Sequence, residues 1–240
     1  MTMKFLLIHG GWQGGWSWAA VVDELQSRGH RAWAPTMPGL EPGEVDRSTS
    51  GLHAYIDCVA SLLAAENTDD VVVVAHSGGG PIAQGLYERQ ASQIRQIVFV
   101  DAWALKDGER ILDILAPEMA AGFVAAAQAS PDHTVPMPPE FWVHGLCNDL
   151  PEADAMSWMD RVVPCPIGWF TERLSLPTFA ASGVATGYIF LDQDVTVDRS
   201  IYQEMAARLG TPATTTCPGA HEAMLSQPRA LAEAILRVSG

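Results

Sequence analysis

Lysine is almost missing from this chain of 240 residues, which holds only Lys4 and Lys106 and has a formal net charge of −14. Binding to nucleic acid or to an anionic membrane surface depends on clustered cations. We therefore expect neither nucleic acid nor a membrane as a partner. Solubility alone is a sufficient explanation of an acidic surface.

Cysteine and long hydrophobic runs are also scarce. The four cysteines show neither the paired spacing of a zinc site nor the density of a disulfide scaffold. No stretch approaches the roughly 20 apolar residues of a membrane span, and the first apolar run, residues 5–8, is too short for a signal peptide. We expect a cytoplasmic protein without metal or cofactor, and the oligomeric state is left open, with a homodimer as one option.

Short apolar runs alternate with helical patterns along much of the chain. Residues 71–74 are all valine, as expected for a strand that is covered on both faces. Apolar residues repeat at helical spacing from Trp18 to Leu25, where Ser17 is the expected N-cap and Gly29 the expected end. This alternation predicts an α/β fold, a mostly parallel sheet with helices on both faces. The predicted strands are 3–9, 31–35, 71–76, 96–101, 188–191 and 214–217, and further helices are predicted over 52–65, 80–90 and 228–238.

The alternation stops after Asp101. Residues 105–185 hold no convincing strand pattern and nine of the sixteen prolines. A segment of this length is too long for a plain loop. We predict a core made of residues 1–104 and 186–240, and a mostly helical cap formed by residues 105–185.

The stretch Ala75-His76-Ser77-Gly78-Gly79-Gly80 follows the all-valine run and precedes a helical pattern. A serine in a tight turn between a strand and a helix is typical of a nucleophile, since small neighbours let the strand and the helix approach closely. Ala75 stands where the strict pattern has glycine. A glycine-rich loop without chemistry is the alternative, and a phosphate site is disfavoured because no lysine lies nearby.

A second glycine pair, Gly10 and Gly11, follows the first predicted strand. Acyl transfer needs two N–H donors aimed at the developing oxyanion, one from such an early turn and one from the residue after the nucleophile. Gly11 and Gly78 fit these two positions. The residues that we expect to contact the substrate are Gly10, Trp12, His76, Trp103, Trp142 and Trp158.

A serine nucleophile needs a base and a carboxylate that orients the base. His221 lies in a late loop just before the final helix, where the chain order serine, acid, histidine places the base. Asp194 is the favoured acid because it lies further out from the end of its strand than Asp192. Asp192 and Asp101 remain alternatives.

Together these motifs resemble the α/β-hydrolase superfamily. More narrowly, the chain resembles the small branch of plant methylesterases, salicylate-binding esterases and hydroxynitrile lyases, together with bacterial pyrethroid-hydrolase-like esterases. The residues that carry the resemblance are 8–18, the turn at Ser77, Asp192-Gln193-Asp194 and Gly219-Ala220-His221.

The resemblance implies a hydrolase core with a cap over the site, with Asp194 as the acid and Gly11 and Gly78 as oxyanion donors. At two positions this sequence differs from the hydroxynitrile lyases. Those enzymes place a hydroxyl side chain where this sequence has Gly10 and a lysine where it has Glu222. A cation beside the base would help to hold cyanide, so lyase activity is disfavoured.

The hypothesis is a serine hydrolase that acts through an acyl-enzyme on a small neutral ester or lactone, apolar or aromatic. Between residues 111 and 185 the only cations are Arg161 and Arg173, against nine acidic residues. An acidic cap disfavours anionic substrates. A lyase or cyclase that uses the same triad for acid–base chemistry and a small-molecule receptor without turnover are the alternatives.

Overall fold

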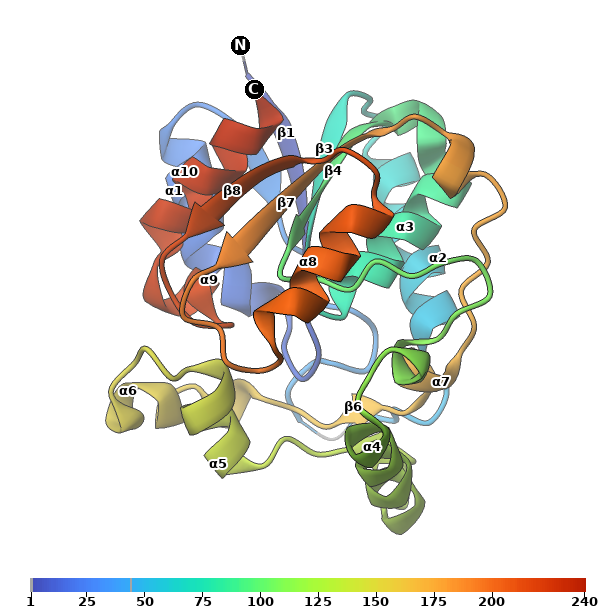
Figure 1. Cartoon of the computed structure of the whole chain (residues 1–240), viewed down its shortest axis with the longest axis vertical. Helices are drawn as coiled ribbons and strands as arrows, with labels where there is room; N and C mark the ends of the chain where they lie inside the picture. The colour runs from blue at the N-terminus through green and yellow to red at the C-terminus, as the bar shows by residue number, and fades with distance from the viewer. Residues whose placement is uncertain (1, 44) are drawn as a thin grey trace.

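A single six-stranded sheet forms the centre of the protein. The computed structural model describes residues 2–43 and 45–240. The strands lie in the order β2-β1-β3-β4-β7-β8, and each neighbouring pair is parallel (Figure 1). The α/β fold predicted from the sequence is confirmed. The strands are β1 (Lys4–Ile8), β2 (Arg31–Trp33), β3 (Val71–His76), β4 (Ile94–Val100), β7 (Ala185–Leu191) and β8 (Ala213–Cys217).

Helices cover both faces of the sheet, and each face has its own hydrophobic core. Side chains alternate along a strand, so Phe5 and Leu7 of β1 face one core while Leu6 and Ile8 face the other. The first core is covered by α1 (Ala19–Ser27) and α10 (Pro228–Ser239). The second is covered by α2 (Leu52–Ala65), α3 (Gly79–Gln90) and α8 (Arg199–Arg208). Among the described residues, none of the helices has the length and apolar character needed to cross a membrane.

The start of the first helix differs from the prediction. Ser17 lies inside a 3₁₀ turn, η1 (Gly15–Trp18), and its Oγ donates to the Gly14 carbonyl at 3.0 Å. It therefore does not cap α1, which continues directly from this turn. Gly29, by contrast, has the left-handed φ of 83° that ends a helix, as expected.

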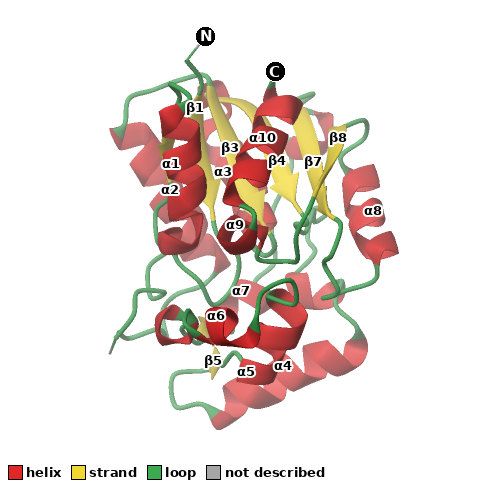
Figure 2. Cartoon of the chain, turned by 90° about the vertical axis from the view of Figure 1, so that its left-hand side faces the viewer, coloured by secondary structure: helices red, strands yellow, loops and turns green. Residues whose placement is uncertain are grey.

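Residues 111–171 pack below the carboxyl ends of the strands, and the chain then returns past α3 to the start of β7 (Figure 1 and Figure 2). They hold short helices, as predicted, but also two antiparallel two-residue strands that the sequence pattern did not predict. A two-residue strand is too short to show any periodicity. The division into core and cap stays a prediction, and "the cap" below means residues 105–185. Its elements are η3 (Ile111–Asp113), α4 (Pro117–Ala129), β5 (Thr134–Val135), α5 (Pro139–Phe141), η4 (Trp142–Leu146), α6 (Glu152–Met156), η5 (Met159–Arg161), β6 (Cys165–Pro166), α7 (Gly168–Thr171) and η6 (Phe179–Ala181).

Candidate active site

The candidate site residues meet at one edge of the sheet. Gly11 follows β1, Ser77 follows β3, Asp194 follows β7 and His221 follows β8. All these strands are parallel, so their carboxyl ends lie together, which is where ligands bind in open α/β sheets. Gly11, Ser77 and His221 line one pocket at this edge.

Ser77 occupies a strained turn between β3 and α3. Its φ is 51°, and its carbonyl accepts hydrogen bonds from the N–H groups of Gly80 at 3.2 Å and Trp103 at 3.1 Å. A Cβ on Gly80 would lie 2.0 Å from the Trp103 carbonyl oxygen, and one on Gly79 would lie 2.8 Å from the His9 carbonyl oxygen. The glycines thus permit the close approach of strand and helix that this turn requires.

His221 is paired with Asp194. The two side chains are 7% and 1% exposed, and His221 Nδ1 lies 2.6 Å from Asp194 Oδ2. Burial alone would lower the pKa of His221, but the Asp194 carboxylate offsets burial and raises the pKa above its usual value of 6.5. Burial likewise opposes ionisation of Asp194, yet the charge of His221 and hydrogen bonds from His221 and Thr196 hold its pKa below the usual range.

The two alternative acids have other partners. Asp192 Oδ1 accepts from the Gly219 N–H at 3.1 Å, which fits a turn residue. Asp101 is fully buried, and its Oδ2 accepts from the Leu191 N–H at 2.9 Å. Burial, reinforced by the charge of Asp194, raises the pKa of Asp101 well above its usual value. Of the three candidates, the structure brings Asp194 to the imidazole.

The turn after β1 is held by the cap. Trp12 has a φ of 63°, and its N–H donates to Cys165 Sγ at 2.9 Å. Its carbonyl accepts from the Val163 N–H at 3.0 Å, and its indole N–H donates to the Val135 carbonyl at 2.8 Å. A left-handed conformation in a bulky residue persists only where its surroundings hold it. These three contacts fix the turn that carries Gly11.

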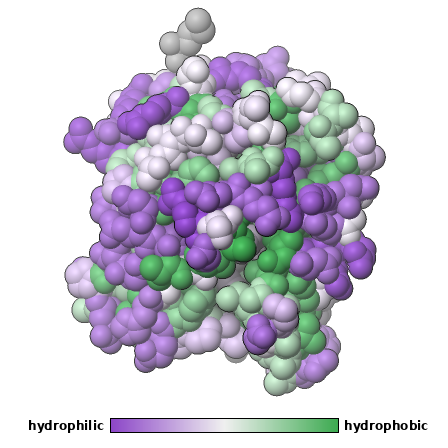
Figure 3. All heavy atoms as spheres, in the orientation of Figure 1, coloured by the Kyte–Doolittle hydropathy of each residue, from purple (hydrophilic) through white to green (hydrophobic). Residues whose placement is uncertain are grey.

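The pocket is a small, mostly apolar cavity between the sheet and the cap. Its empty volume, open mouth included, is about 570 Å³. Figure 3 shows hydrophobic residues gathered in the middle of one face, at the level where the cap begins. The described lining residues include no Asp, Glu, Lys or Arg. Apolar lining residues from the cap are Ile111, Leu115, Met119, Phe123, Phe141, Leu146, Trp169 and Phe170.

The other predicted substrate contacts divide into two groups. Trp12 and Trp103 line the pocket. Trp142 does not, because it is fully buried in the cap, where its indole N–H donates to the Ala155 carbonyl at 2.9 Å. Trp158 is also away from the pocket and stacks on Trp16 with ring centroids 5.5 Å apart. Composition could not show which face of an irregular cap segment each tryptophan occupies.

Gly10 and His76 lie behind the described pocket wall. A Cβ on Gly10 would lie 2.8 Å from His76 Nδ1 and 3.0 Å from Ser77 Cβ, so Gly10 serves the packing of the turn. His76 is fully buried, with its ring centroid 4.5 Å from that of His221. Neither residue was found among those that line the pocket.

A buried cluster lies beside the base. Glu222 is fully buried and accepts a hydrogen bond from Gln13 Nε2. Burial raises the pKa of Glu222 to about 8, against the opposing effect of His221. Burial, followed by the charge of His221, lowers the pKa of His76 well below its usual value. Burial therefore favours the neutral form of both side chains.

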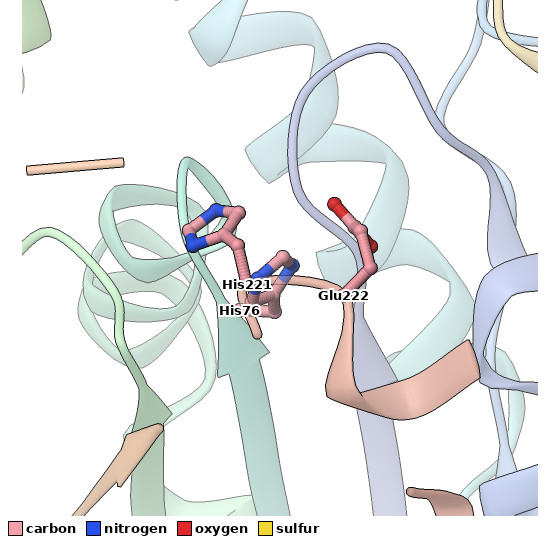
Figure 4. Close-up of side chains that lie close together, drawn as sticks. All are labelled: His76, His221 and Glu222. Carbon is pink, nitrogen blue, oxygen red and sulfur yellow. The ribbon is translucent and has the colours of Figure 1, made fainter. Parts of the chain in front are cut away.

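Figure 4 shows His76, His221 and Glu222 grouped near the end of β3. Their potential ligand atoms lie within 4.8 Å of one another, so a metal ion could be held here. The Nδ1 atom of His221 is already hydrogen-bonded to Asp194, which leaves Nε2, the atom that a serine nucleophile needs. The expectation that no metal takes part stays a prediction.

Comparisons with known proteins agree with this geometry. The model of the alpha/beta hydrolase family matches residues 5–234. The chain belongs to this family. The α/β-hydrolase is 30% identical to a carbendazim hydrolyzing esterase of Nocardioides sp. (strain SG-4G), over 96% of this chain and 97% of that protein. It is 25% identical to putative methylesterase 12, chloroplastic, of Arabidopsis thaliana, over 98% of this chain and 71% of that protein.

A solved structure shows the same fold. An extracellular alpha/beta-hydrolase from a Paenibacillus species superposes with a TM-score of 0.93 at 24% sequence identity, over 98% of each chain. The resemblance predicted from the motifs is therefore confirmed. This α/β-hydrolase is a carboxylesterase-like hydrolase, related to esterases and methylesterases.

Proposed function

We propose that Ser77, His221 and Asp194 form a catalytic triad that hydrolyses small neutral esters through an acyl-enzyme. His221 Nε2 takes the proton of the Ser77 hydroxyl while Ser77 Oγ attacks the ester carbonyl carbon. The protonated imidazole then gives this proton to the departing alcohol. A water molecule, activated in the same way, cleaves the acyl-enzyme and returns Ser77 to its starting state.

Asp194 keeps the Nδ1–H of His221 in place and stabilises the imidazolium that forms. The N–H groups of Gly11 and Gly78 hold the oxyanion of the tetrahedral intermediate. Both glycines line the pocket. Each such donor is worth about 3–4 kcal/mol of transition-state stabilisation.

One observation carries the proposal. Ser77 and His221 face one apolar pocket, and His221 is hydrogen-bonded to a buried carboxylate at 2.6 Å. A nucleophile, a base and an acid that orients the base have this arrangement in serine hydrolases on unrelated folds.

The uncharged, mostly apolar residues that line the pocket support a neutral substrate with an apolar or aromatic group. The aromatic side chains of Trp12, Trp103 and Trp169 line the same pocket as Ser77. An anionic group would lose its hydration in this pocket without meeting a cation on the described wall. Lactones share the neutral carbonyl chemistry and fall in the same class.

The decisive test is Ser77→Ala assayed on short p-nitrophenyl esters. We expect kcat to fall by about 10⁴-fold or more, while Ser92→Ala, a change at an exposed serine in the turn between α3 and β4, leaves it unchanged. Turnover by Ser77→Ala at the wild-type rate would overturn the proposed nucleophile. In the same assay, p-nitrophenyl butyrate should be cleaved with a much higher kcat/KM than the anionic p-nitrophenyl hemisuccinate.

A relative is named for hydrolysis of carbendazim, so this compound belongs in the first substrate screen. The screen should also include mandelonitrile. Cleavage of mandelonitrile without labelling of Ser77 by a serine-directed phosphonate would favour the lyase alternative. Binding of a ligand without any product would favour the receptor alternative.

A further inference from the structure

Two hydroxyl groups lie beside the Asp194–His221 pair and are not part of the triad. Thr196 Oγ1 lies 2.5 Å from Asp194 Oδ1, and the Thr196 backbone N–H donates to the same oxygen at 2.8 Å. The Tyr202 hydroxyl of α8 lies 2.9 Å from Thr196 Oγ1 and 3.4 Å from His221 Nδ1. Both Thr196 and Tyr202 line the pocket.

The direction of these hydrogen bonds follows from the donors available. An ionised Asp194 only accepts, so the hydroxyl proton of Thr196 points to Asp194 Oδ1. Thr196 Oγ1 is then an acceptor on its other side, and the Tyr202 O–H donates to it. The Nδ1–H of His221 is directed at Asp194 Oδ2. Proton donation therefore runs from Tyr202 through Thr196 to Asp194.

Tyr202 is well placed to act in its neutral form. Its side chain is almost fully buried, and burial together with the charge of Asp194 raises its pKa well above the usual value. Its ring packs on Trp103 with centroids 5.8 Å apart. The ring is thus held by packing, while the hydroxyl is held by Thr196.

We propose that Thr196 and Tyr202 are positioning residues that fix one oxygen of the Asp194 carboxylate through a chain of two hydroxyls. This fixes the other oxygen on His221 Nδ1 and so orients the imidazole toward Ser77. Because both residues also line the pocket, an ester bound there would contact the same two side chains that position Asp194. The proposal rests on the triad proposed above.

The test uses conservative variants that keep side-chain shape. Tyr202→Phe keeps the ring against Trp103 and removes the hydroxyl. Thr196→Val keeps the volume and removes the donor, and Thr196→Ser restores the donor. Tyr188→Phe is the matched control, since the buried Tyr188 hydroxyl donates its hydrogen bond to the Ala102 carbonyl at 3.0 Å and not to Asp194, Thr196 or His221.

We expect kcat for p-nitrophenyl butyrate to fall about fivefold in Tyr202→Phe and about tenfold or more in Thr196→Val, because hydrogen bonds to charged groups are the stronger ones. KM should change less than twofold in both variants, and Thr196→Ser should recover most of kcat. The double variant Tyr202→Phe/Thr196→Val should be no slower than Thr196→Val alone, because Tyr202 acts through Thr196.

Three results would overturn the inference. These are losses that multiply in the double variant, losses confined to KM, and equal effects of Tyr202→Phe and Tyr188→Phe. If the proposed triad is wrong, a separate result shows it, namely undiminished turnover by Ser77→Ala. If Ser77→Ala is inactive while Tyr202→Phe behaves like the control, the triad stands and the hydroxyl chain does not.

Discussion

The backbone N–H of Trp12 donates a hydrogen bond to the thiol sulfur of Cys165 at 2.9 Å, which joins the turn after β1 to the cap strand β6. The contact lies one residue from Gly11, a proposed oxyanion donor. Burial raises the pKa of the Cys165 thiol, so the sulfur stays neutral and accepts this hydrogen bond as a thiol.

Cys165→Ala should lower kcat about fivefold with little change in KM. Loss of the sulfur acceptor removes one of the contacts that hold Trp12 in its left-handed backbone conformation, so the Gly11 N–H is less well placed for the oxyanion. A fivefold loss corresponds to the free energy of one neutral hydrogen bond. Cys147→Ala is the control, because Cys147 is equally buried but packs in the Trp142 cluster of the cap. Steady-state kinetics should separate the two variants, and an equal kcat would contradict a role for this contact.

Asp194→Asn should lower kcat/KM by about 10⁴-fold and move its acid limb to lower pH. Activity requires neutral His221, so kcat/KM rises as pH increases through the His221 pKa. Asp194 raises that pKa above 6.5, although Glu222 and Asp101 contribute in the same direction. Removing the charge of Asp194 therefore lowers the midpoint. Asp192→Asn should leave both the rate and the midpoint unchanged, and a pH–rate profile measures both.

Two helical glycines should respond to alanine in opposite ways. Gly122→Ala in α4 meets nothing within 4 Å and should stabilise the protein by about 0.5–1 kcal/mol. Gly80→Ala in α3 would place its Cβ 2.0 Å from the Trp103 carbonyl oxygen, and we expect a loss of about 1–3 kcal/mol or more. Urea unfolding gives both values. Stabilisation by Gly80→Ala would show that the nucleophile turn is less tightly packed.

Glu222→Gln should make stability less dependent on pH. The pKa of Glu222 is about 8 in the folded protein, against a usual value of 4.5. The folded state binds the proton more tightly, so this group's favourable contribution is complete below pH 4.5 and is lost as pH rises through 8. Gln cannot ionise and still accepts from Gln13. The melting temperature of Glu222→Gln should therefore fall less than that of the wild type between pH 5 and 9, and parallel curves would contradict burial of this carboxyl.

Residues near strand ends were within reach of sequence reasoning. Ser77 stands in a motif whose small neighbours are required by backbone contact, and His221 and Asp194 follow strands whose parallel order fixes where they meet. Of the pocket wall, Trp12 and Trp103 were within reach, but most of the remaining lining residues were not. Tyr202 and Thr196 gave no pattern of their own. Trp169 and the buried Trp142 belong to short elements without clear periodicity, and Phe123 belongs to the alanine-rich helix α4. Which way such side chains face is decided by tertiary packing.

The three hydrogen bonds between Trp12 and the cap have a consequence for engineering the substrate range. Much of the apolar wall comes from one continuous segment between β4 and β7, which invites its exchange for the corresponding segment of a relative. A graft would have to bring its own partners for the Trp12 amide, carbonyl and indole. A foreign segment that encloses the new substrate well but lacks these three contacts would yield an enzyme that binds this substrate but hydrolyses it very slowly.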